Sequence, residues 1–157
     1  MKPNIEISEN NLKEVATLLN TLLADEYVLI TKTRNAHWNV QGQNFMELHK
    51  LFEGQYEAVD NIIDEVAERI RTLGHFAIAS LKDFLKVTHL TEQDDDFTDQ
   101  KKIIQTLLNT NEVIVRTLRN DIVAVGEKYK DLGTDDFLTG ILKHHEKTAW
   151  MLRAYLS

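Results

Sequence analysis

The sequence contains no cysteine and only one proline in its 157 residues. The absence of cysteine excludes a disulfide framework and a thiolate metal site, and it is consistent with a reducing compartment. One proline and six glycines leave long uninterrupted stretches of helix-forming residues, which predicts an all-α protein. A chain of this length is typical of one domain with a single core, so we expect residues 1–157 to form one domain.

Long apolar runs are also absent. No segment approaches the roughly 18 consecutive apolar residues of a membrane-spanning helix. The opening residues, Met-Lys-Pro-Asn-Ile-Glu, lack the apolar core of a signal peptide. We therefore expect a soluble cytoplasmic protein with no membrane partner.

Apolar residues recur at helical spacing along most of the chain, which predicts helices rather than strands. Four long helices are expected: from Ser8–Asn11 to His37 or Trp38, over 44–74, over 98–130, and from Thr134 after a break at Gly133. A short helix is expected within 75–87, and the run 94–96 of three aspartates is interpreted as a solvated loop. This pattern predicts a four-helix bundle with a short extra helix in the long crossover between helices 2 and 3.

The stretch 34–68 concentrates residues that commonly bind metals. His37 and His49 flank a short turn, and the helix expected after that turn carries Glu53, Asp64 and Glu68. Imidazole and carboxylate groups suit iron, zinc or manganese where thiolates are absent. Asp64 and Glu68 lie about 130–170° from the centre of their helix's apolar stripe, at about 100° per residue. The two acids therefore point away from the core of their own bundle.

His49 and Asp64 are too far apart to share an ion within one chain. They are 15 residues apart, which is about 22 Å on a helix rising about 1.5 Å per residue. Metal–ligand bonds are only about 2 Å long. The spacing predicts either a site shared by two chains related by a twofold axis, or no combined site. The alternative is that Asp64 and Glu68 simply belong to a solvated helix face.

The candidate ligands lie within a longer sequence motif. The sequence H-W-N-V-Q-G-x-N-F-x-x-L-H-x-x-F-E, followed by D-E-V-A-E-R-I and the closing H-E-K-T-A-W-M-L-R-A-Y-L, resembles the Dps family of mini-ferritins over essentially the whole chain. The resemblance implies a ferritin-like four-helix bundle. The chain has no Glu-x-x-His pair of the kind that ordinary di-iron bundles direct into their own core, which excludes an intrachain centre of that type.

The resemblance also implies a ferroxidase centre at a twofold interface. In the family, one subunit gives two histidines twelve residues apart, and the other gives an Asp and a Glu four apart. His37, His49, Asp64 and Glu68 match these positions without a gap, and Glu53 stands at a further acidic position beside the histidines. Iron is the expected metal, and zinc is expected to compete for the same ligands.

Three further residues have alternative interpretations. Trp38 is a core or interface residue by its type, and the resemblance also makes it a candidate electron donor. Arg34, one turn before His37, either supports the site by hydrogen bonding or forms a surface ion pair. His145 falls within an apolar stripe of the last helix and is interpreted as a satisfied core histidine rather than a ligand.

The net charge of −7 argues against a nucleic-acid partner. Duplex binding depends on clustered Lys and Arg, but residues 1–13 hold two lysines against two glutamates. The resemblance implies a dodecamer built from twofold dimers, and twelve times −7 is −84 for such a shell. We therefore expect weak or absent DNA binding, unless cations bridge the two surfaces.

The resemblance further implies that iron enters a hollow shell through acidic pores at threefold axes. Glu127, Asp131, Asp135 and Asp136 lie where such a pore would be lined. The alternative is that these acids stabilise helix ends, with Asp135 and Asp136 in the first turn of the last helix.

The predicted function is that of an iron-sequestering ferroxidase. It would oxidise Fe²⁺ with hydrogen peroxide, or more slowly with dioxygen, and store ferric mineral inside the oligomer, which protects against oxidative damage. Two alternatives remain open: a DNA-compacting Dps protein, and a non-catalytic, metal-binding helical scaffold.

Overall fold

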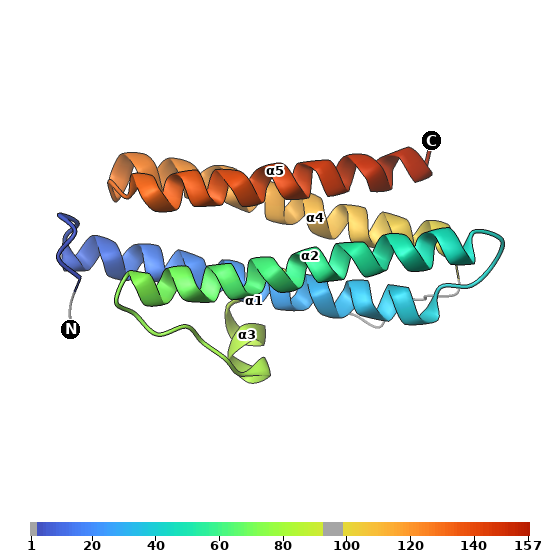
Figure 1. The fold of residues 1–157 in the computed structure, drawn as a ribbon, viewed down its shortest axis with the longest axis horizontal. Coiled ribbons are helices and arrows are strands. Elements are labelled where there is room, and N and C mark those ends of the chain that lie inside the picture. The colour runs from blue at the N-terminus through green and yellow to red at the C-terminus, as the bar shows by residue number, and fades with distance from the viewer. Residues whose placement is uncertain (1–2, 93–98) are drawn as a thin grey trace.

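The computed structural model describes residues 3–92 and 99–157, which form a bundle of four long helices (Figure 1). These helices are α1 (Glu9–Asn39), α2 (Phe45–Thr72), α4 (Gln100–Val123) and α5 (Leu132–Tyr155). The short α3 (Leu81–Val87) lies in the crossover from α2 to α4, and α4 continues into a π-helical turn, η1 (Ala124–Lys128). The described residues contain no strand. The predicted all-α bundle with an extra crossover helix is confirmed.

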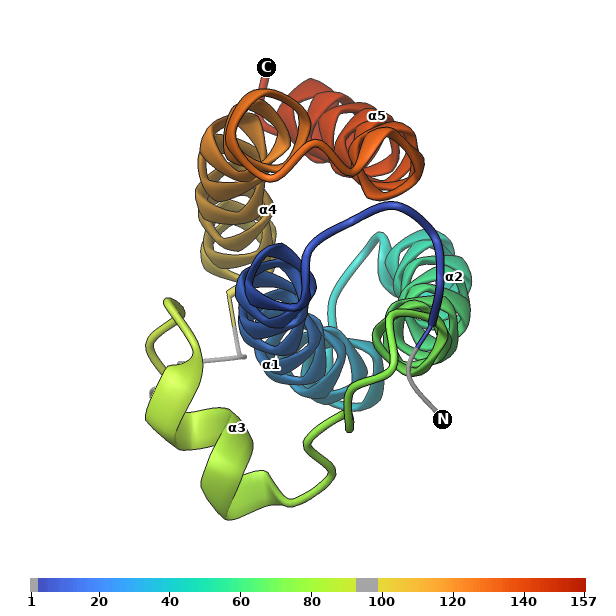
Figure 2. The same ribbon diagram turned by 90° about the vertical axis from the view of Figure 1, so that its left-hand side faces the viewer.

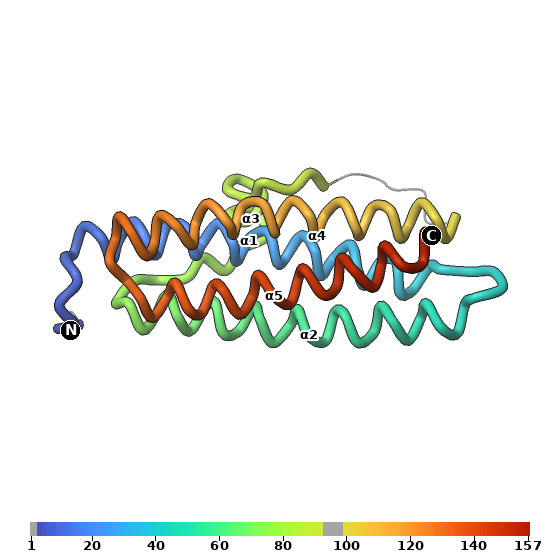
Figure 3. The backbone as a smooth tube through the Cα atoms, turned by 90° about the horizontal axis from the view of Figure 1, so that it is seen from above, coloured from blue at the N-terminus to red at the C-terminus, as the bar shows by residue number. Residues whose placement is uncertain are grey.

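Each helix occupies one corner of the bundle. Seen end-on in Figure 2, α1 pairs with α2 and α4 pairs with α5. Helix α4 also lies beside α1, and α5 beside α2, as the view from above in Figure 3 shows along their length. The short α3 sits outside the bundle against α1, where the rings of Tyr27 and Phe84 stack with centroids 4.1 Å apart. The α1–α2 turn and the C-terminal end of α2 lie at opposite ends of the bundle (Figure 1).

The ends of the first two helices follow local sequence signals. The Ser8 side chain accepts a hydrogen bond from the Asn11 N–H at 3.2 Å and caps α1, which begins at Glu9, within the range predicted for its start. Asn44 precedes α2, but its side chain makes no capping hydrogen bond. Gly74 ends α2 with a φ of 85°, a left-handed conformation that glycine adopts without steric cost.

The corner between α4 and α5 differs from the prediction. Lys130 takes a φ of 59° and reverses the chain before Gly133, which lies inside the first turn of α5. The cap of α5 is Asp131, whose Oδ1 accepts the Thr134 N–H at 3.0 Å. The predicted break at Gly133 and helix start at Thr134 are therefore wrong, because a left-handed lysine at position 130 supplies the turn and α5 already begins at Leu132.

The core is a continuous apolar cluster that also encloses a hydrogen-bonded polar group of Glu26, Asn111 and His145. Its largest fully buried members come from α1, α2 and α4 and include Leu19, Leu23, Phe52, Ile70, Ile103, Leu107 and Leu118. Within it, His145 is completely buried, with Nδ1 2.9 Å from Asn111 Oδ1 and Nε2 2.8 Å from Glu26 Oε1. The interpretation of His145 as a satisfied core histidine is confirmed.

Phe45 lies on the surface at the start of α2, where it is 38% exposed. The aspartates at 94–96 lie outside the described residues. Among the residues that are described, no helix is long and apolar enough to cross a membrane.

Candidate metal centre

The tight turn between α1 and α2 brings His37 and His49 together. Their rings stack with centroids 3.8 Å apart and an interplanar angle of 18°. The Nδ1 atom of His37 lies 2.8 Å from the backbone oxygen of His49, and the Nδ1 atom of His49 lies 2.9 Å from the backbone oxygen of His37. Each histidine therefore holds the other's ring in place.

This reciprocal pairing fixes the chemistry of both rings. A carbonyl oxygen only accepts hydrogen bonds, so each Nδ1 must carry a proton. In neutral histidine the other nitrogen, Nε2, then bears the free lone pair. Metal-binding histidines commonly donate their second ring N–H to a carbonyl or carboxylate, which orients the ring and raises its basicity. The pair is thus prepared to offer two Nε2 ligands.

Aromatic side chains enclose the pair. Tyr56 contacts the His37 ring edge-on at 5.2 Å, and Phe45 stacks on the His49 ring at 5.1 Å. His37 is buried, whereas His49 is half-buried. Glu53 lies four residues after His49 on α2, and it is also half-buried. Residues four apart lie on one helix face, so Glu53 is in position to add a carboxylate.

The two predicted acidic ligands occupy another part of the protomer. Asp64 and Glu68 are exposed on the C-terminal half of α2. Because α2 is continuous from Phe45 to Thr72, these acids are far from the histidine pair at its start. Across residues 3–92 and 99–157, no three or more His, Asp or Glu side chains come close enough to hold one ion. One protomer therefore carries two separate groups of candidate ligands.

Arg34 adopts the surface alternative rather than a direct contact with a ligand. Its Nη2 atom lies 3.5 Å from Asp60 Oδ1, and its guanidinium lies over the Tyr56 ring at 5.2 Å. An exposed pair of this kind contributes about 0–1 kcal/mol. Trp38 is 69% exposed, so it is not part of the protomer's core.

The four acids considered for a pore differ in their surroundings. Asp131 is 2% exposed and caps α5, which matches the helix-end alternative. Asp135 is half-buried against the π-helical turn, while Glu127 and Asp136 are exposed. The sequence reasoning did not single out Arg69, which binds Asp131 at 3.1 Å. In the sequence, the one indication of a role for Arg69 is its position directly after Glu68.

Comparison with known proteins decides the family. A ferritin-like domain model matches residues 16–157. The chain is 35% identical over 145 residues to the DNA protection during starvation protein 2 of Bacillus anthracis, covering 92% of this chain and 98% of that protein. It is 32% identical over 140 residues to the DNA protection during starvation protein of Helicobacter pylori, covering 89% of this chain and 96% of that protein. This chain belongs to the Dps family.

Solved structures agree with this assignment. The Dps protein of Vibrio cholerae O1, described as a member of a superfamily of ferritin-like diiron-carboxylate proteins, matches with a TM-score of 0.92 at 32% identity. The match covers 100% of this chain and 98% of that one. Dps of Thermosynechococcus elongatus matches with a TM-score of 0.88 at 30% identity, over 94% of this chain and 93% of that one. The Dps fold predicted from the motifs is therefore confirmed.

Proposed function

We propose that this Dps chain is a ferroxidase subunit whose substrate is Fe²⁺ and whose metal site is completed by a second copy of the chain. The observation that carries the proposal is the locked histidine pair, with both Nδ1 atoms held by backbone carbonyls. Two imidazoles alone are an incomplete metal site, since such sites in proteins take three or more protein ligands. The exposed Asp64 and Glu68 are the carboxylates that the pair lacks.

A twofold axis would supply these carboxylates. If two copies of α2 pack antiparallel, the histidine end of one faces the acidic end of the other, and two equivalent sites form. Each site would then combine His37, His49 and Glu53 of one chain with Asp64 and Glu68 of the second. A mixed nitrogen and oxygen ligand set suits ferrous iron, and zinc would compete for it.

The proposed reaction is oxidation of ferrous iron by hydrogen peroxide. Two Fe²⁺ ions give one electron each, and the peroxide takes up these electrons with two protons to form two waters. Dioxygen would serve as a slower oxidant. The ferric product would be stored as mineral in a hollow homo-oligomer, with a dodecamer expected. Ferrous iron and peroxide together generate hydroxyl radicals, so consuming both would protect the cell, in keeping with the stress-protection names of the relatives.

The decisive experiment is complementation between two inactive variants. One chain carries His37→Ala and His49→Ala, and the other carries Asp64→Ala and Glu68→Ala. Each homo-oligomer should fail to bind and oxidise Fe²⁺ in anaerobic titration followed by peroxide addition. In a mixed dimer, one of the two sites would contain only unaltered residues, so random co-assembly should restore about a quarter of the wild-type sites.

An exposed acid on the same helix provides the control. Glu65 is adjacent to Asp64 but lines the cleft toward α5, so Glu65→Ala should leave oxidation unchanged. Co-assembly that restores no activity, while each variant still folds and assembles, would contradict a shared site. Full activity of the Asp64→Ala/Glu68→Ala chain alone would favour a different catalytic centre, whereas a wild-type chain that oxidises no Fe²⁺ would favour the non-catalytic scaffold.

DNA binding is expected to be weak or absent because the net charge per chain is −7. A gel shift with duplex DNA at low salt tests this directly. Strong retardation that disappears with added salt would instead favour the DNA-compacting alternative. We also propose that the exposed Glu127 and Asp136, with Asp135, are the acids that would line an iron-entry pore.

A further inference from the structure

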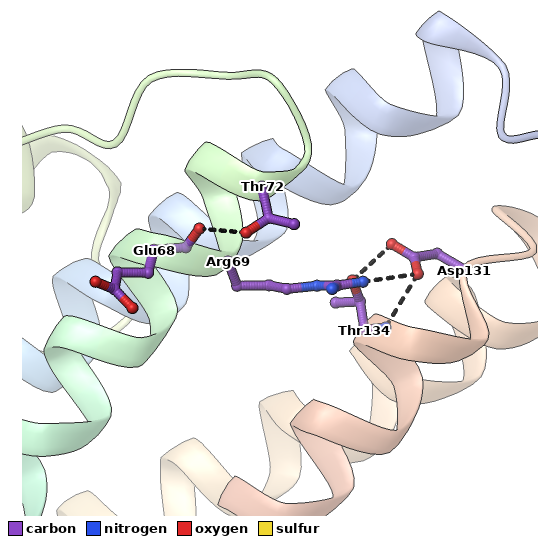
Figure 4. Close-up of polar contacts among 5 residues, drawn as sticks. All are labelled: Glu68, Arg69, Thr72, Asp131 and Thr134. Carbon is purple, nitrogen blue, oxygen red and sulfur yellow. Dashed lines mark hydrogen bonds and ion pairs between the residues drawn. The ribbon is translucent and has the colours of Figure 1, made fainter. Parts of the chain in front are cut away.

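The last turn of α2 is tied to the first turn of α5 by a closed set of hydrogen bonds (Figure 4). Arg69 Nε donates to Thr134 Oγ1 at 2.9 Å, and Arg69 Nη2 donates to Asp131 Oδ1 at 3.1 Å. The Thr134 hydroxyl donates to Asp131 Oδ2 at 2.6 Å, and its N–H donates to Asp131 Oδ1 at 3.0 Å. We call these three residues the Arg69 clamp. Both carboxylate oxygens of Asp131 are engaged in it.

The clamp matters because α2 and α5 are otherwise separated along this stretch. A cleft of about 470 Å³ lies between the two helices, lined on the α2 side by Ala58, Asn61, Ile62 and Glu65. The acid-bearing part of α2 therefore packs on α1 but faces open space toward α5. The Arg69 clamp closes that gap at the end of the helix, one residue beyond Glu68.

The Arg69 side chain points from α2 toward Asp131 and Thr134, whereas that of Glu68 points away from them (Figure 4). Fixing the arginine on α5 therefore also fixes the rotation of the helix that presents the carboxylate. A side chain at the edge of a helix lies about 5–6 Å from its axis, so a rotation of about 10° moves it by about 1 Å. A misplacement of about 1 Å can lower the rate of an enzyme about 100-fold.

A glycine in the first turn of α5 makes room for the clamp. A Cβ atom built on Gly133 would lie 2.9 Å from Arg69 Nη2 and 3.6 Å from Asp131 Oδ1. The clash is with the far end of a flexible side chain, so an alanine at 133 would displace the guanidinium rather than the backbone. Gly133→Ala thus disturbs the clamp without removing any of its hydrogen-bonding groups.

We infer that Arg69 is a positioning residue for the acidic half of the metal site, acting through Glu68 and with Asp131 and Thr134 as its anchor on α5. The inference rests on the proposed function. It assigns Asp131 to this anchor rather than to a pore. Asp131 and Thr134, at the start of α5, do not bind the metal in this proposal. Through Arg69 they control the direction in which the Glu68 carboxylate on α2 points.

The test compares the affinity of the assembled protein for Fe²⁺, measured by anaerobic calorimetric titration, with its rate of peroxide-driven oxidation. Arg69→Met, Thr134→Val and Gly133→Ala should each weaken binding or slow oxidation about 10- to 100-fold. Thr134→Ser retains the hydroxyl and should behave like the wild type. Arg71→Met is the matched control, because Arg71 sits on the same turn but takes no part in the clamp; it bonds the His75 carbonyl at 2.8 Å and stacks on Phe76.

A double variant separates positioning from general stability. If Arg69 acts through Glu68, Arg69→Met should have no further effect on iron affinity in a Glu68→Gln background. The inference would be overturned if the clamp variants had a lower Tm but, as intact assemblies, bound Fe²⁺ with normal affinity. It would also be overturned if the losses of Fe²⁺ affinity caused by Arg69→Met and Glu68→Gln added up in the double variant. If Glu68→Gln alone leaves affinity unchanged, the proposed function itself fails, and that result is distinct from a failure of the clamp.

Discussion

Replacing His145 with leucine should destabilise the bundle by about 3–5 kcal/mol, because the change strips a buried carboxylate of its partner. Both His145 and Glu26 are completely buried, and their closest atoms are 2.8 Å apart. Glu26 Oε2 already has no hydrogen-bond partner among the described residues. Without the imidazole, neither oxygen of this carboxylate would have a partner.

The hydrogen bonds of Asn111 show which atoms around His145 carry protons. Its Nδ2 donates to the Leu107 carbonyl at 2.8 Å, so its Oδ1 faces His145 as an acceptor. His145 Nδ1 must therefore be a donor, and one further proton lies between His145 Nε2 and Glu26 Oε1. Leucine at 145 would also leave Asn111 Oδ1 without its donor, which costs about 1–3 kcal/mol for a buried group.

Thermal and denaturant unfolding monitored by circular dichroism measure the effect. At about 2–4 °C per kcal/mol for a chain of this size, His145→Leu should lower Tm by roughly 6–20 °C. The double variant Glu26→Leu/His145→Leu should recover most of that loss, because well-packed apolar residues often replace a buried ion pair at no net cost. A single variant within 1 kcal/mol of the wild type, or a double variant worse than the single, would refute the reasoning.

Three smaller perturbations test other parts of the structure. Burial and the neighbouring His145 lower the pKa of His144 below its ordinary 6.5, so the unfolded chain binds more protons, and stability should fall as the pH drops below 6.5. In the His144→Gln variant, the free energy of unfolding should therefore depend less on pH below 6.5. Burial raises the pKa of Asp121 above its ordinary 3.8, so its charge is unfavourable in the fold, and Asp121→Asn should raise Tm at pH 7 but not below pH 3.8. Ser8→Ala removes the cap of α1 and should cost about 0.5–2 kcal/mol by denaturant unfolding.

The helices and the histidine pair were predictable because their signals are local. The apolar spacing in α2 located the helix, and the short turn before it predicted that His37 and His49 would meet. Their reciprocal hydrogen bonds were not predictable, since they depend on the path of the backbone through the turn. A left-handed Lys130 was equally hidden, because lysine rarely adopts that conformation and Gly133 offered the more usual signal.

Asp131 shows where sequence reasoning reached its limit. Its place near a helix start is compatible with a pore, a cap or an ion pair, and the choice depends on a partner 62 residues away. Only the packing of α2 beside α5 brings Arg69 to it. The role of a residue such as Asp131 is determined by contacts across the bundle. Residue spacing along the chain therefore does not predict that role correctly.

The buried polar group and the candidate metal centre also illustrate opposite uses of histidine within one bundle. At His145 both ring nitrogens are engaged inside the protomer, so no lone pair is left for a metal. At His37 and His49 the hydrogen bonds within the described residues engage Nδ1 and not Nε2. The difference lies in which partner each ring meets, and under the proposed function it makes the pair at the α1–α2 turn, rather than His145, the one that would receive iron. A variant that gave His145 a free nitrogen, such as Glu26→Leu, should still bind no iron in the core, because the described residues contain no group of three or more His, Asp or Glu side chains that could hold an ion there.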